Sequence, residues 1–392
     1  MKVKFLNDIM KNQINRIISI LLLAIVCMSG SAFAGETDDT EALTEAPTLE
    51  DHAFVDETEL LYAENFCIYN YEDGYSVIDI PGSGTYIVVP EGGEVPAGAE
   101  DMIVLQKPLD NIYLAASSAM SLFSAVDAVE HIRLSGLDES GWYIAAAAEA
   151  MQAGDMIYAG KYSEPDYELL ISEDCDLAIE STMIFHTPKV KEMIEDLDIP
   201  VLVDRSSYES HPLGRTEWIK LYAVLVDKQE EAESFFNEQA QVIEDLEDTE
   251  NIGKTVAFFY INTDGSVVIR SPEDYIPRMI EIGGGIYAFS DIETTTSATS
   301  FSITMEEFYA TACETDYLIY NGSIEGEITS VDELIQKDSL FADMKAVKEG
   351  HVWTVGREFY QSTDIVGQLI KDVNLMLSGA DDSQMTFLRK VD

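Results

Sequence analysis

The chain has 392 residues, with 23 Lys and Arg against 73 Asp and Glu, which gives a formal net charge of −50. Hydrophobic residues make up 46% of the sequence, so the chain can bury a core, and its length favours two domains. The acidic balance argues strongly against nucleic acid and anionic lipid as partners, because both are bound through clustered Lys and Arg.

The first 34 residues have the pattern of a signal peptide. Four cations precede an apolar run of about 12 residues at 17–28, too short for the ~20 residues that span a bilayer, and Ala32-Phe33-Ala34 follows. We expect cleavage after Ala34 and an exported protein, on the cell surface or in a periplasm. One alternative is a buried or membrane helix. Another is a lipid anchor at Cys27, although Val26 stands where such sites carry a small residue.

Residues 35–58 contain nine acidic residues and no Lys or Arg, which predicts a disordered acidic leader. Short apolar runs separated by Gly-rich turns then predict a β-rich segment at 59–110. Three widely spaced cysteines remain after the signal peptide, and we expect buried thiols, with one disulfide as the alternative. They are Cys67, Cys175 and Cys313.

From residue 111 onward, short apolar strands alternate with helical periodicity, which predicts two α/β lobes with mainly parallel sheets. The first lobe spans 111–212 and the second spans 251–392. Residues 213–250 between them contain one internal Gly near the start and no Pro, so we expect one long interlobe helix. The alternative is a pair of helices with a turn near Asp227. Strand candidates in the first lobe are 112–114, 156–159, 177–179 and 201–203.

With this pattern of two lobes and a connecting helix, the chain resembles the substrate-binding proteins of ABC importers for iron complexes and cobalamin. The stretch Glu209-Ser210-His211-Pro212-Leu213-Gly214-Arg215-Thr216-Glu217-Trp218-Ile219-Lys220 looks like the start of the backbone helix in a clostridial-type branch of that family. Segments 158–162 and 165–168 look similar too. The resemblance implies two Rossmann-like lobes joined by one helix, no enzymatic activity, no resident cofactor, and a monomer that delivers its ligand to an ABC importer permease.

The family carries one glutamate near the tip of each lobe, which pairs with arginines of the permease. In the first lobe it lies eight residues before an Asp that leads into a strand, and Glu168 lies eight residues before Asp176. The same count back from Asp316 reaches Phe308, so this sequence departs from the pattern in the second lobe. Glu307 is our first candidate there, and Glu306 is the second. A solvated carboxylate at a helix start is the plain alternative for each.

Ligand groups in α/β lobes gather beyond the carboxyl ends of the strands. Arg and Tyr at such positions would suit an iron chelate, haem or a corrinoid, because Arg binds oxyanions and Tyr offers a ring and a hydroxyl. Ordinary packing is the rival interpretation for each residue. Trp142 and Tyr143 are candidates for the cleft mouth. The predicted cleft residues are Ser117, Ser118, Lys161, Tyr162, Ser181, His186, Arg205, Tyr208, Arg270, Tyr320, Asn321, Arg357 and Tyr360.

Three other functions compete with this one. A direct Zn or Mn site would need three or four His, Asp or Glu ligands, but the five histidines are scattered, and His186 with His211 is the best available pair. A surface adhesin would need no closable cleft. An enzyme is disfavoured because the sequence lacks GxxxxGK[ST], GxSxG and GxGxxG motifs.

Overall fold

The computed structural model describes residues 43–247, 251–293 and 298–392, which all belong to one unit, Thr40–Asp392. The predicted signal peptide and residues 35–42 of the predicted leader lie outside these ranges. Among the helices that are described, none combines the length and the apolar character needed to cross a bilayer.

The N-terminal part forms a five-stranded sheet that is antiparallel except for its last pair. Alternate residues of its strands face two cores: Ile78 and Tyr86 pack with the first lobe, and Val77 and Ile87 belong to a separate cluster. The strands, in spatial order, are β1 (Phe54–Glu57), β2 (Cys67–Tyr71), β3 (Ser76–Ile80), β4 (Gly84–Val89) and β5 (Ile103–Gln106), with a 3-10 turn η1 (Glu72–Gly74) between β2 and β3.

The predicted disordered leader is structured over its described part, which corrects the sequence-based prediction. Residues 54–57 form β1, and Leu49 is 5% exposed within the separate cluster of the N-terminal sheet. Leu43 and Ala46 pack against the same cluster, and the backbone N–H of Leu43 donates to Asp79 at 2.9 Å. A few apolar residues therefore anchor an otherwise acidic segment, because a sheet face is available to receive them.

Two buried glutamates hold the segment between β1 and β2. The Glu217 carboxylate accepts hydrogen bonds from the backbone N–H groups of residues 61–63, at 2.8–3.1 Å. Glu209 accepts from those of residues 64 and 65, at 2.8 and 3.1 Å. Both glutamates are at most 1% exposed. The acidic composition of the chain is thus partly internal, where buried carboxylates accept hydrogen bonds from the backbone of a connecting segment.

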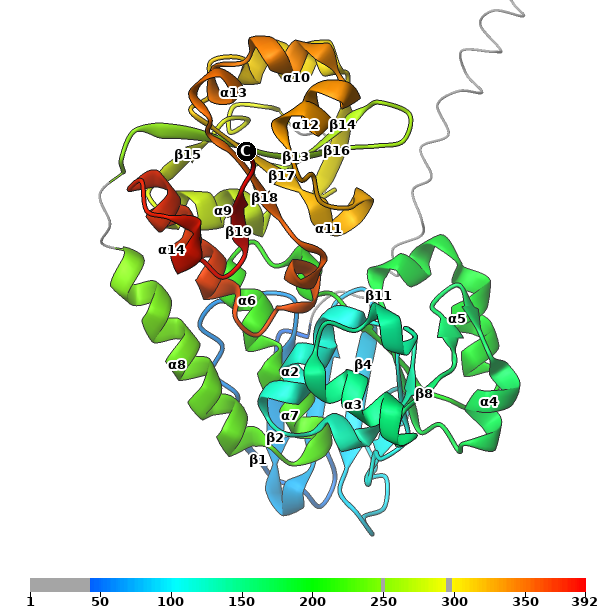
Figure 1. Cartoon of the computed structure of the whole chain (residues 1–392). Helices are drawn as coiled ribbons and strands as arrows, with labels where there is room; N and C mark the ends of the chain where they lie inside the picture. Colours follow the sequence, from blue (N-terminus) through cyan, green and yellow to red (C-terminus); the bar gives the residue numbers. More distant parts are fainter. Residues whose placement is uncertain (1–42, 248–250, 294–297) are drawn as a thin grey trace, which may run out of the picture. The chain divides into compact units, whose positions relative to one another are not determined.

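The first lobe is a parallel five-stranded sheet with helices on both faces, as Figure 1 shows. Leu177 and Ile179 of its central region face the core shared with α2 and α7, whereas Ala178 faces the core of α4 and α5. The strands in spatial order are β12 (Val201–Asp204), β11 (Leu177–Ser181), β6 (Ile112–Leu114), β7 (Ile132–Ser135) and β8 (Ile157–Tyr158). The remaining elements are η2 (Ser117–Ala119), α2 (Met120–Ala125), η3 (Val129–His131), η4 (Glu139–Gly141), α3 (Ala145–Ala153), the hairpin β9 (Gly160–Lys161) and β10 (Glu164–Pro165), α4 (Tyr167–Ser172), η5 (Thr182–His186), α5 (Pro188–Glu195) and η6 (Ser206–Tyr208).

Two side chains of the N-terminal sheet take the place of a further strand beside β12. Because β12 is the edge of its sheet, one row of its backbone groups needs other partners. Ser83 Oγ accepts from the N–H of Val203 at 2.9 Å, and the Tyr86 hydroxyl donates to the carbonyl of Val201 at 2.9 Å. The N-terminal sheet therefore covers an edge that would otherwise be open to pairing with another chain.

Three helices, rather than one, connect the lobes, so the prediction of a continuous helix over 213–250 is wrong. They are α6 (Pro212–Glu217), α7 (Ile219–Val226) and α8 (Gln229–Glu247). Asp227 ends α7 in the left-handed conformation, with φ of 58°, and its carboxylate lies 2.6 Å from Nζ of Lys107. Asp is among the residues that tolerate this conformation, so the chain can turn here without Gly or Pro.

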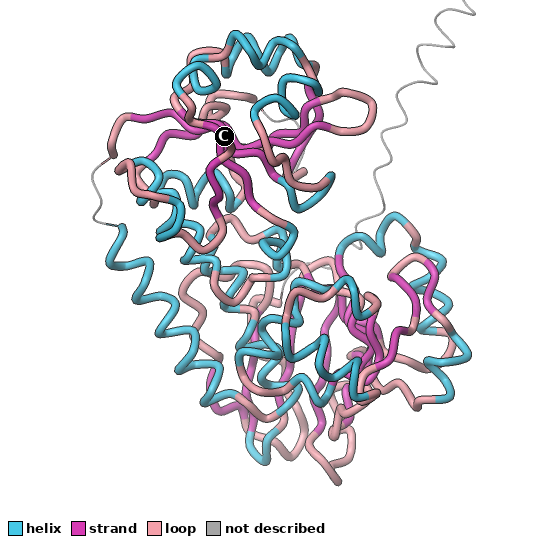
Figure 2. The backbone as a smooth tube through the Cα atoms, viewed as in Figure 1, coloured by secondary structure: helices cyan, strands magenta, loops and turns pink. Residues whose placement is uncertain are grey.

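The second lobe has a mixed sheet, in which β13, β17 and β18 are parallel neighbours. Helices α9 and α14 pack on the side that contacts α6 and α8, and Figures 1 and 2 show α10, α12 and α13 across the sheet. The strands are β16 (Ser300–Ile303), β14 (Val267–Arg270), β13 (Lys254–Ile261), β17 (Tyr317–Asn321), β18 (Val352–Val355) and β19 (Leu388–Lys390), with β15 (Gly285–Tyr287) beside β13. The helices are α9 (Tyr275–Ile282), α10 (Met305–Ala312), α11 (Gly322–Glu325), α12 (Val331–Lys337), α13 (Lys345–Glu349) and α14 (Val366–Leu377), with 3-10 turns η7 (Ser339–Asp343), η8 (Arg357–Gln361) and η9 (Asp382–Gln384). The predicted α/β class is confirmed, with a wholly parallel sheet in the first lobe, whereas three of the six strand pairs in the second-lobe sheet are antiparallel.

Candidate functional site

A cavity of about 580 Å³ lies between the two lobes, where strands from both sheets end. One wall is formed by residues at or just after the ends of β7 and β8 in the first lobe. The other wall is formed by residues just after the ends of β17 and β18 in the second lobe. Ligand pockets of proteins commonly measure ~300–1,000 Å³ and lie at such strand ends. The lining residues are Gly136, Leu137, Asp138, Ser140, Gly141, Tyr143, Tyr158, Lys161, Ser323, Ile324, Arg357 and Tyr360.

Two tight loops build the first-lobe wall. Asp138 accepts hydrogen bonds from the Ser140 hydroxyl at 2.6 Å and from the N–H of Gly141 at 3.1 Å, and these bonds lower the pKa of Asp138. Gly160 is the first residue of β9, the strand that carries Lys161, and it follows two residues after Tyr158 of β8. Its φ is +85°, and a Cβ there would lie 2.3 Å from the carbonyl oxygen of Glu164, so the hairpin requires glycine at this position.

The second-lobe wall depends on the close approach of α11 to the end of β18. The side chain of Asn321 caps α11 by accepting from the N–H of Ser323 at 3.2 Å. A Cβ on Gly322 would lie 2.6 Å from the carbonyl oxygen of Val355. Glycine thus lets the start of α11, with Ser323, come next to Arg357 of η8.

The cavity gathers cations and exposed aromatic rings from a chain that is otherwise strongly acidic. Its charged lining side chains are Lys161, Arg357 and Asp138. Nζ of Lys161 lies 3.1 Å from the carboxylate of Glu164, whereas Arg357 has no ion-pair partner among the described residues. The rings of Tyr143 and Tyr158 are 46% and 48% exposed. This arrangement can offer hydrogen-bond donors to oxyanions and stacking faces to flat ligands.

Three of the predicted cleft residues line this cavity, namely Lys161, Arg357 and Tyr360. Tyr162 is the next residue after Lys161, and Ser117 and Ser118 belong to η2, which contacts η8. Of the two candidates for the cleft mouth, Tyr143 lines the cavity. Trp142 is 6% exposed and donates to Ser135 Oγ at 3.1 Å, so it packs inside the first lobe.

Other predicted cleft residues lie elsewhere. The guanidinium of Arg205 sits 5.1 Å from the ring centre of Tyr208, which lines a separate interlobe cavity of about 230 Å³. Arg270 lies 3.5 Å from the carboxylate of Asp274, which is 4% exposed. Burial raises the pKa of Asp274, and the charge of Arg270 opposes this shift. The charged residues that line the smaller cavity are all acidic: Glu209, Glu273 and Asp274.

Four further predicted residues lie outside the interlobe cavity. Tyr320 is 0% exposed and Asn321 is 2% exposed, because the cavity begins two residues later, at Ser323. Ser181 caps η5, and His186 is exposed at the end of that turn. Across the described residues, no three His, Cys, Asp or Glu side chains are gathered to hold a metal ion.

His211, the other histidine considered for a metal, is half-buried, and its Nδ1 is occupied by a neighbour whereas its Nε2 has no hydrogen-bond partner among the described residues. Its ring stacks on Tyr62 with centroids 4.4 Å apart, and its Nδ1 accepts from the N–H of Leu213 at 3.2 Å. Burial lowers the pKa of His211 to about 4. The three predicted free cysteines, Cys67, Cys175 and Cys313, are indeed unpaired and half-buried.

Sequence reasoning missed the loop at 136–141, which forms much of the first-lobe wall. The preceding strand, β7, was not predicted, because its sequence Ile-Arg-Leu-Ser places a cation in a short run. Arg133 is neutralised by Glu173, 2.9 Å away. Recognising the alternation of Ile132 and Leu134 would have been the available signal for this strand.

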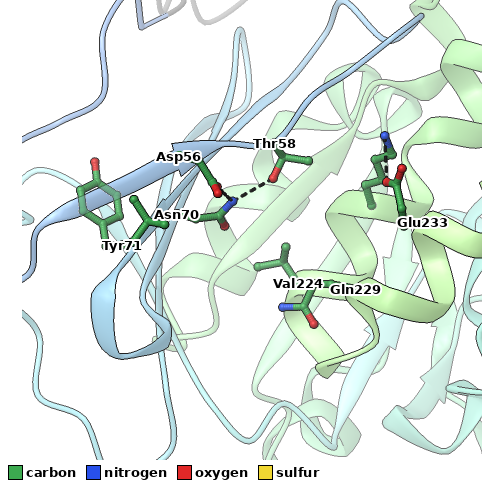
Figure 3. A pocket seen from close by; sticks show the side chains of 9 residues that line it. Asp56, Thr58, Asn70, Tyr71, Val224, Gln229 and Glu233 are labelled. Atoms are coloured by element: carbon green, nitrogen blue, oxygen red, sulfur yellow. Dashed lines mark hydrogen bonds and ion pairs between the residues drawn. The ribbon is translucent and has the colours of Figure 1, made fainter.

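A further cavity, of about 380 Å³, lies between the N-terminal sheet and the helices α7 and α8 (Figure 3). Its polar side chains mostly satisfy one another: Asn70 donates to Asp56 at 2.9 Å and to Thr58 at 3.0 Å. Lys220, its cation, is paired with Glu217 and Glu233. None of the predicted cleft residues lines it, so the interlobe cavity is the better candidate site.

A family model described as periplasmic binding protein matches residues 133–358, which is more than half of the chain and includes both walls of the interlobe cavity. The chain belongs to the periplasmic binding protein family. This membership confirms the predicted family resemblance and the prediction of a binding protein rather than an enzyme. The clostridial-type branch stays a prediction.

Among sequence relatives of this periplasmic binding protein are two uncharacterized lipoproteins of Methanocaldococcus jannaschii. One is 24% identical over 324 residues, covering 77% of this chain and 75% of the relative. The other is 22% identical over 391 residues, covering 93% and 96%.

Solved structures share the fold at low identity. An ABC-type Fe³⁺-hydroxamate transport protein from Saccharomonospora viridis aligns with a TM-score of 0.55 and 18% identity, covering 70% of this chain and 94% of that chain. The periplasmic heme-binding protein of Vibrio cholerae aligns with a TM-score of 0.54 and 15% identity, covering 68% and 97%.

The predicted docking glutamates of this periplasmic binding protein occupy helix starts. Glu168 is the second residue of α4, and Glu306 is the second residue of α10. Glu307 follows as the third residue, where it forms a capping box with Thr304 at 2.8–3.2 Å, and bonds from Thr304 lower the pKa of Glu307. Helix α10 has 8 residues and α4 has 6. Because α10 is two residues longer, counting eight positions back from Asp316 stops two residues after Glu306. Position within the helix therefore matches Glu168 with Glu306.

Proposed function

We propose that the chain captures an anionic iron chelate, such as a ferric siderophore or haem, in the interlobe cavity and delivers it to an ABC importer. The observation that supports this most is the gathering of Lys161, Arg357 and exposed tyrosines at one cavity of a chain with net charge −50. A uniform acidic surface would repel an anion, so local cations are needed to bind one. Fold neighbours whose names refer to Fe³⁺-hydroxamate and heme binding point to the same ligand class.

A thermal-shift screen tests the ligand class. Ferric citrate, a ferric tricatecholate, haemin and cyanocobalamin would each be added to the mature protein. A ligand present at about 100 times its Kd adds ~2.7 kcal/mol to the free energy of unfolding, which is a readable shift. We expect a shift with at least one iron chelate. A shift with cyanocobalamin alone, or with none of the four, would refute the proposed ligand class.

Charge-removing variants tie the binding to this cavity. Lys161→Met and Arg357→Met should each weaken binding of an anionic chelate by roughly tenfold, because each removes a charged donor. Lys189→Met, on the exposed face of α5, is the matched control and should bind as the wild type does. Equal affinity of all three variants, measured by titration, would place the ligand elsewhere.

We further propose that Glu168 and Glu306 contact the permease. Glu306 is preferred over Glu307, because the carboxylate of Glu307 is held by Thr304. Exposed ion pairs are worth only ~0–1 kcal/mol each, so these two should set the register and rate of docking more than its affinity. The double variant Glu168→Ala, Glu306→Ala should lose stimulation of importer ATPase while keeping ligand affinity. The control variant Glu192→Ala, Glu230→Ala removes two exposed carboxylates elsewhere and should keep full stimulation. Full stimulation by Glu168→Ala, Glu306→Ala would contradict the assignment.

An extracytoplasmic location fits both the family and the predicted signal peptide. The names of the archaeal relatives include the word lipoprotein, so a lipid on Cys27 stands as the alternative to cleavage after Ala34. In either form the cavity would lie outside the membrane, where it can capture ligand before delivery to the permease.

A further inference from the structure

The side-chain amide of Gln361 joins three residues that line the interlobe cavity. Gln361 ends η8 in the second lobe and is 1% exposed. Its Oε1 accepts from the backbone N–H of Tyr143 at 2.8 Å, and its Nε2 donates to the carbonyl oxygen of Gly141 at 2.7 Å. Nε2 also donates to the hydroxyl oxygen of Tyr360 at 3.0 Å. One buried amide therefore links a first-lobe loop to a second-lobe tyrosine.

The orientation of this amide is fixed by its backbone partners. A backbone N–H can only donate, so the atom facing Tyr143 must be the amide oxygen. A carbonyl oxygen can only accept, so the atom facing Gly141 must be the amide nitrogen. The second proton of that nitrogen then points to Tyr360, and all the donors of the Gln361 amide are used.

This orientation determines what the hydroxyl of Tyr360 can do. Because the phenolic oxygen already accepts a hydrogen bond from Gln361, its own proton is available for another acceptor, and Tyr360 lines the cavity beside Arg357. We infer that Gln361 is a positioning residue that locks the 141–143 loop to the second lobe and makes the Tyr360 hydroxyl a donor toward ligand oxygen atoms. The inference rests on the proposed function, and it narrows the ligand to one that presents acceptor oxygens between Arg357 and Tyr360.

The variant Gln361→Glu separates the two halves of this role while keeping the shape of the side chain. Its carboxylate can still accept from Tyr143, but it cannot donate to Gly141, and the Tyr360 hydroxyl must now donate to it. The polarity of Tyr360 toward the ligand is thereby reversed. Gln384→Glu, at an exposed position of η9, adds the same charge away from the cavity and is the matched control.

Two readouts need no ligand. The amide hydrogen of Tyr143 should exchange about tenfold faster or more in Gln361→Glu than in the wild type, because a carboxylate now faces the carbonyl of Gly141 and the loop loosens. The ¹³Cζ resonance of Tyr360, assigned with Tyr360→Phe, should move in Gln361→Glu and stay in place in Gln384→Glu. An unchanged exchange rate would refute the role of Gln361 in holding the 141–143 loop. An unchanged resonance would refute its role in orienting the Tyr360 hydroxyl.

A double-mutant cycle with haemin, which carries two carboxylates, gives the third readout. Tyr360→Phe and Gln361→Glu should each weaken binding about tenfold, and the double variant should be no weaker than either single variant. Additive losses would mean that Gln361 acts on the ligand independently of Tyr360, which would overturn its role in setting the polarity of the Tyr360 hydroxyl. If haemin fails to bind the wild type, the proposed function fails for this ligand, and the two ligand-free readouts decide the role of Gln361.

Discussion

Replacing Asp364 with Asn should stabilise the protein above pH 6 and leave its stability unchanged below pH 4. Asp364 lies just after η8, where its backbone N–H donates to Ser121 Oγ of α2 at 3.3 Å, so it sits at the contact between the lobes. Burial raises the pKa of Asp364 from 3.8 to about 6, and the bond from Ser121 offsets only part of that shift. The carboxylate is therefore less favourable in the folded state than in the unfolded chain.

The sign and size of the effect follow from this pKa. Since the folded state holds the proton more tightly, the free energy of unfolding falls as the pH rises from 3.8 to about 6 and is level beyond that point. A rise of about two pKa units corresponds to about 3 kcal/mol. Asn cannot ionise, yet its oxygen can still accept from Ser121. The variant should thus gain about 3 kcal/mol at pH 7–8 and nothing below pH 4.

Urea unfolding at several pH values between 4 and 8, followed by circular dichroism, measures this difference. Comparing each variant with the wild type at the same pH removes the trend caused by the other acidic groups. Glu192→Gln, on the exposed side of α5, removes one carboxylate as a control and should show no pH-dependent gain. A gain for Asp364→Asn that is the same at pH 4 and pH 8, or absent at both, would refute the reasoning.

Three shorter predictions concern other parts of the chain. Ser83→Ala leaves a buried backbone N–H of β12 without a partner and should cost about 1–3 kcal/mol in urea unfolding, whereas Ser302→Ala, at an exposed position, should cost little. Glu217→Gln weakens the hydrogen bonds to three backbone N–H groups and should lower the free energy of unfolding by about 3 kcal/mol. The exposed control Glu230→Gln should lower it little, and equal losses in the two variants would contradict the anchoring role of Glu217. Mass spectrometry of the exported protein should show an N-terminus at residue 35, and a lipid-modified form lost in Cys27→Ser would show the anchor instead.

The break between α7 and α8 shows where sequence patterning fails. The segment from Arg215 to Glu247 contains no Gly or Pro, so the helical periodicity continues across the turn and no helix-breaking residue signals it. The left-handed residue is Asp227, and its ion pair comes from Lys107, 120 positions away. A contact that is so distant in sequence cannot be inferred from the local pattern, although the alternative turn near Asp227 could be.

The docking residues illustrate a different limit. Counting eight positions back from the Asp before a strand reaches Glu168, an exposed residue at the start of the short helix α4. In the second lobe the same count reaches Phe308, which is 0% exposed in the core. Helix length varies between repeats of a fold, whereas the position after the helix cap is tied to backbone geometry. Position from the helix start is therefore the better guide, and it selects Glu306.

The large negative charge, which first served to exclude partners, also makes the few cations informative. Several carboxylates are buried and bind backbone N–H groups. Asp372, which is 1% exposed, accepts backbone hydrogen bonds from residues 386–388, just as Glu217 does from residues 61–63. Several cations already form ion pairs within the chain, as Lys107 does with Asp227. Arg357 faces the interlobe cavity without such a partner among the described residues, next to a tyrosine whose oxygen is already bonded to Gln361. A cation and a donor hydroxyl placed side by side in this way can both donate to the acceptor oxygens of one ligand.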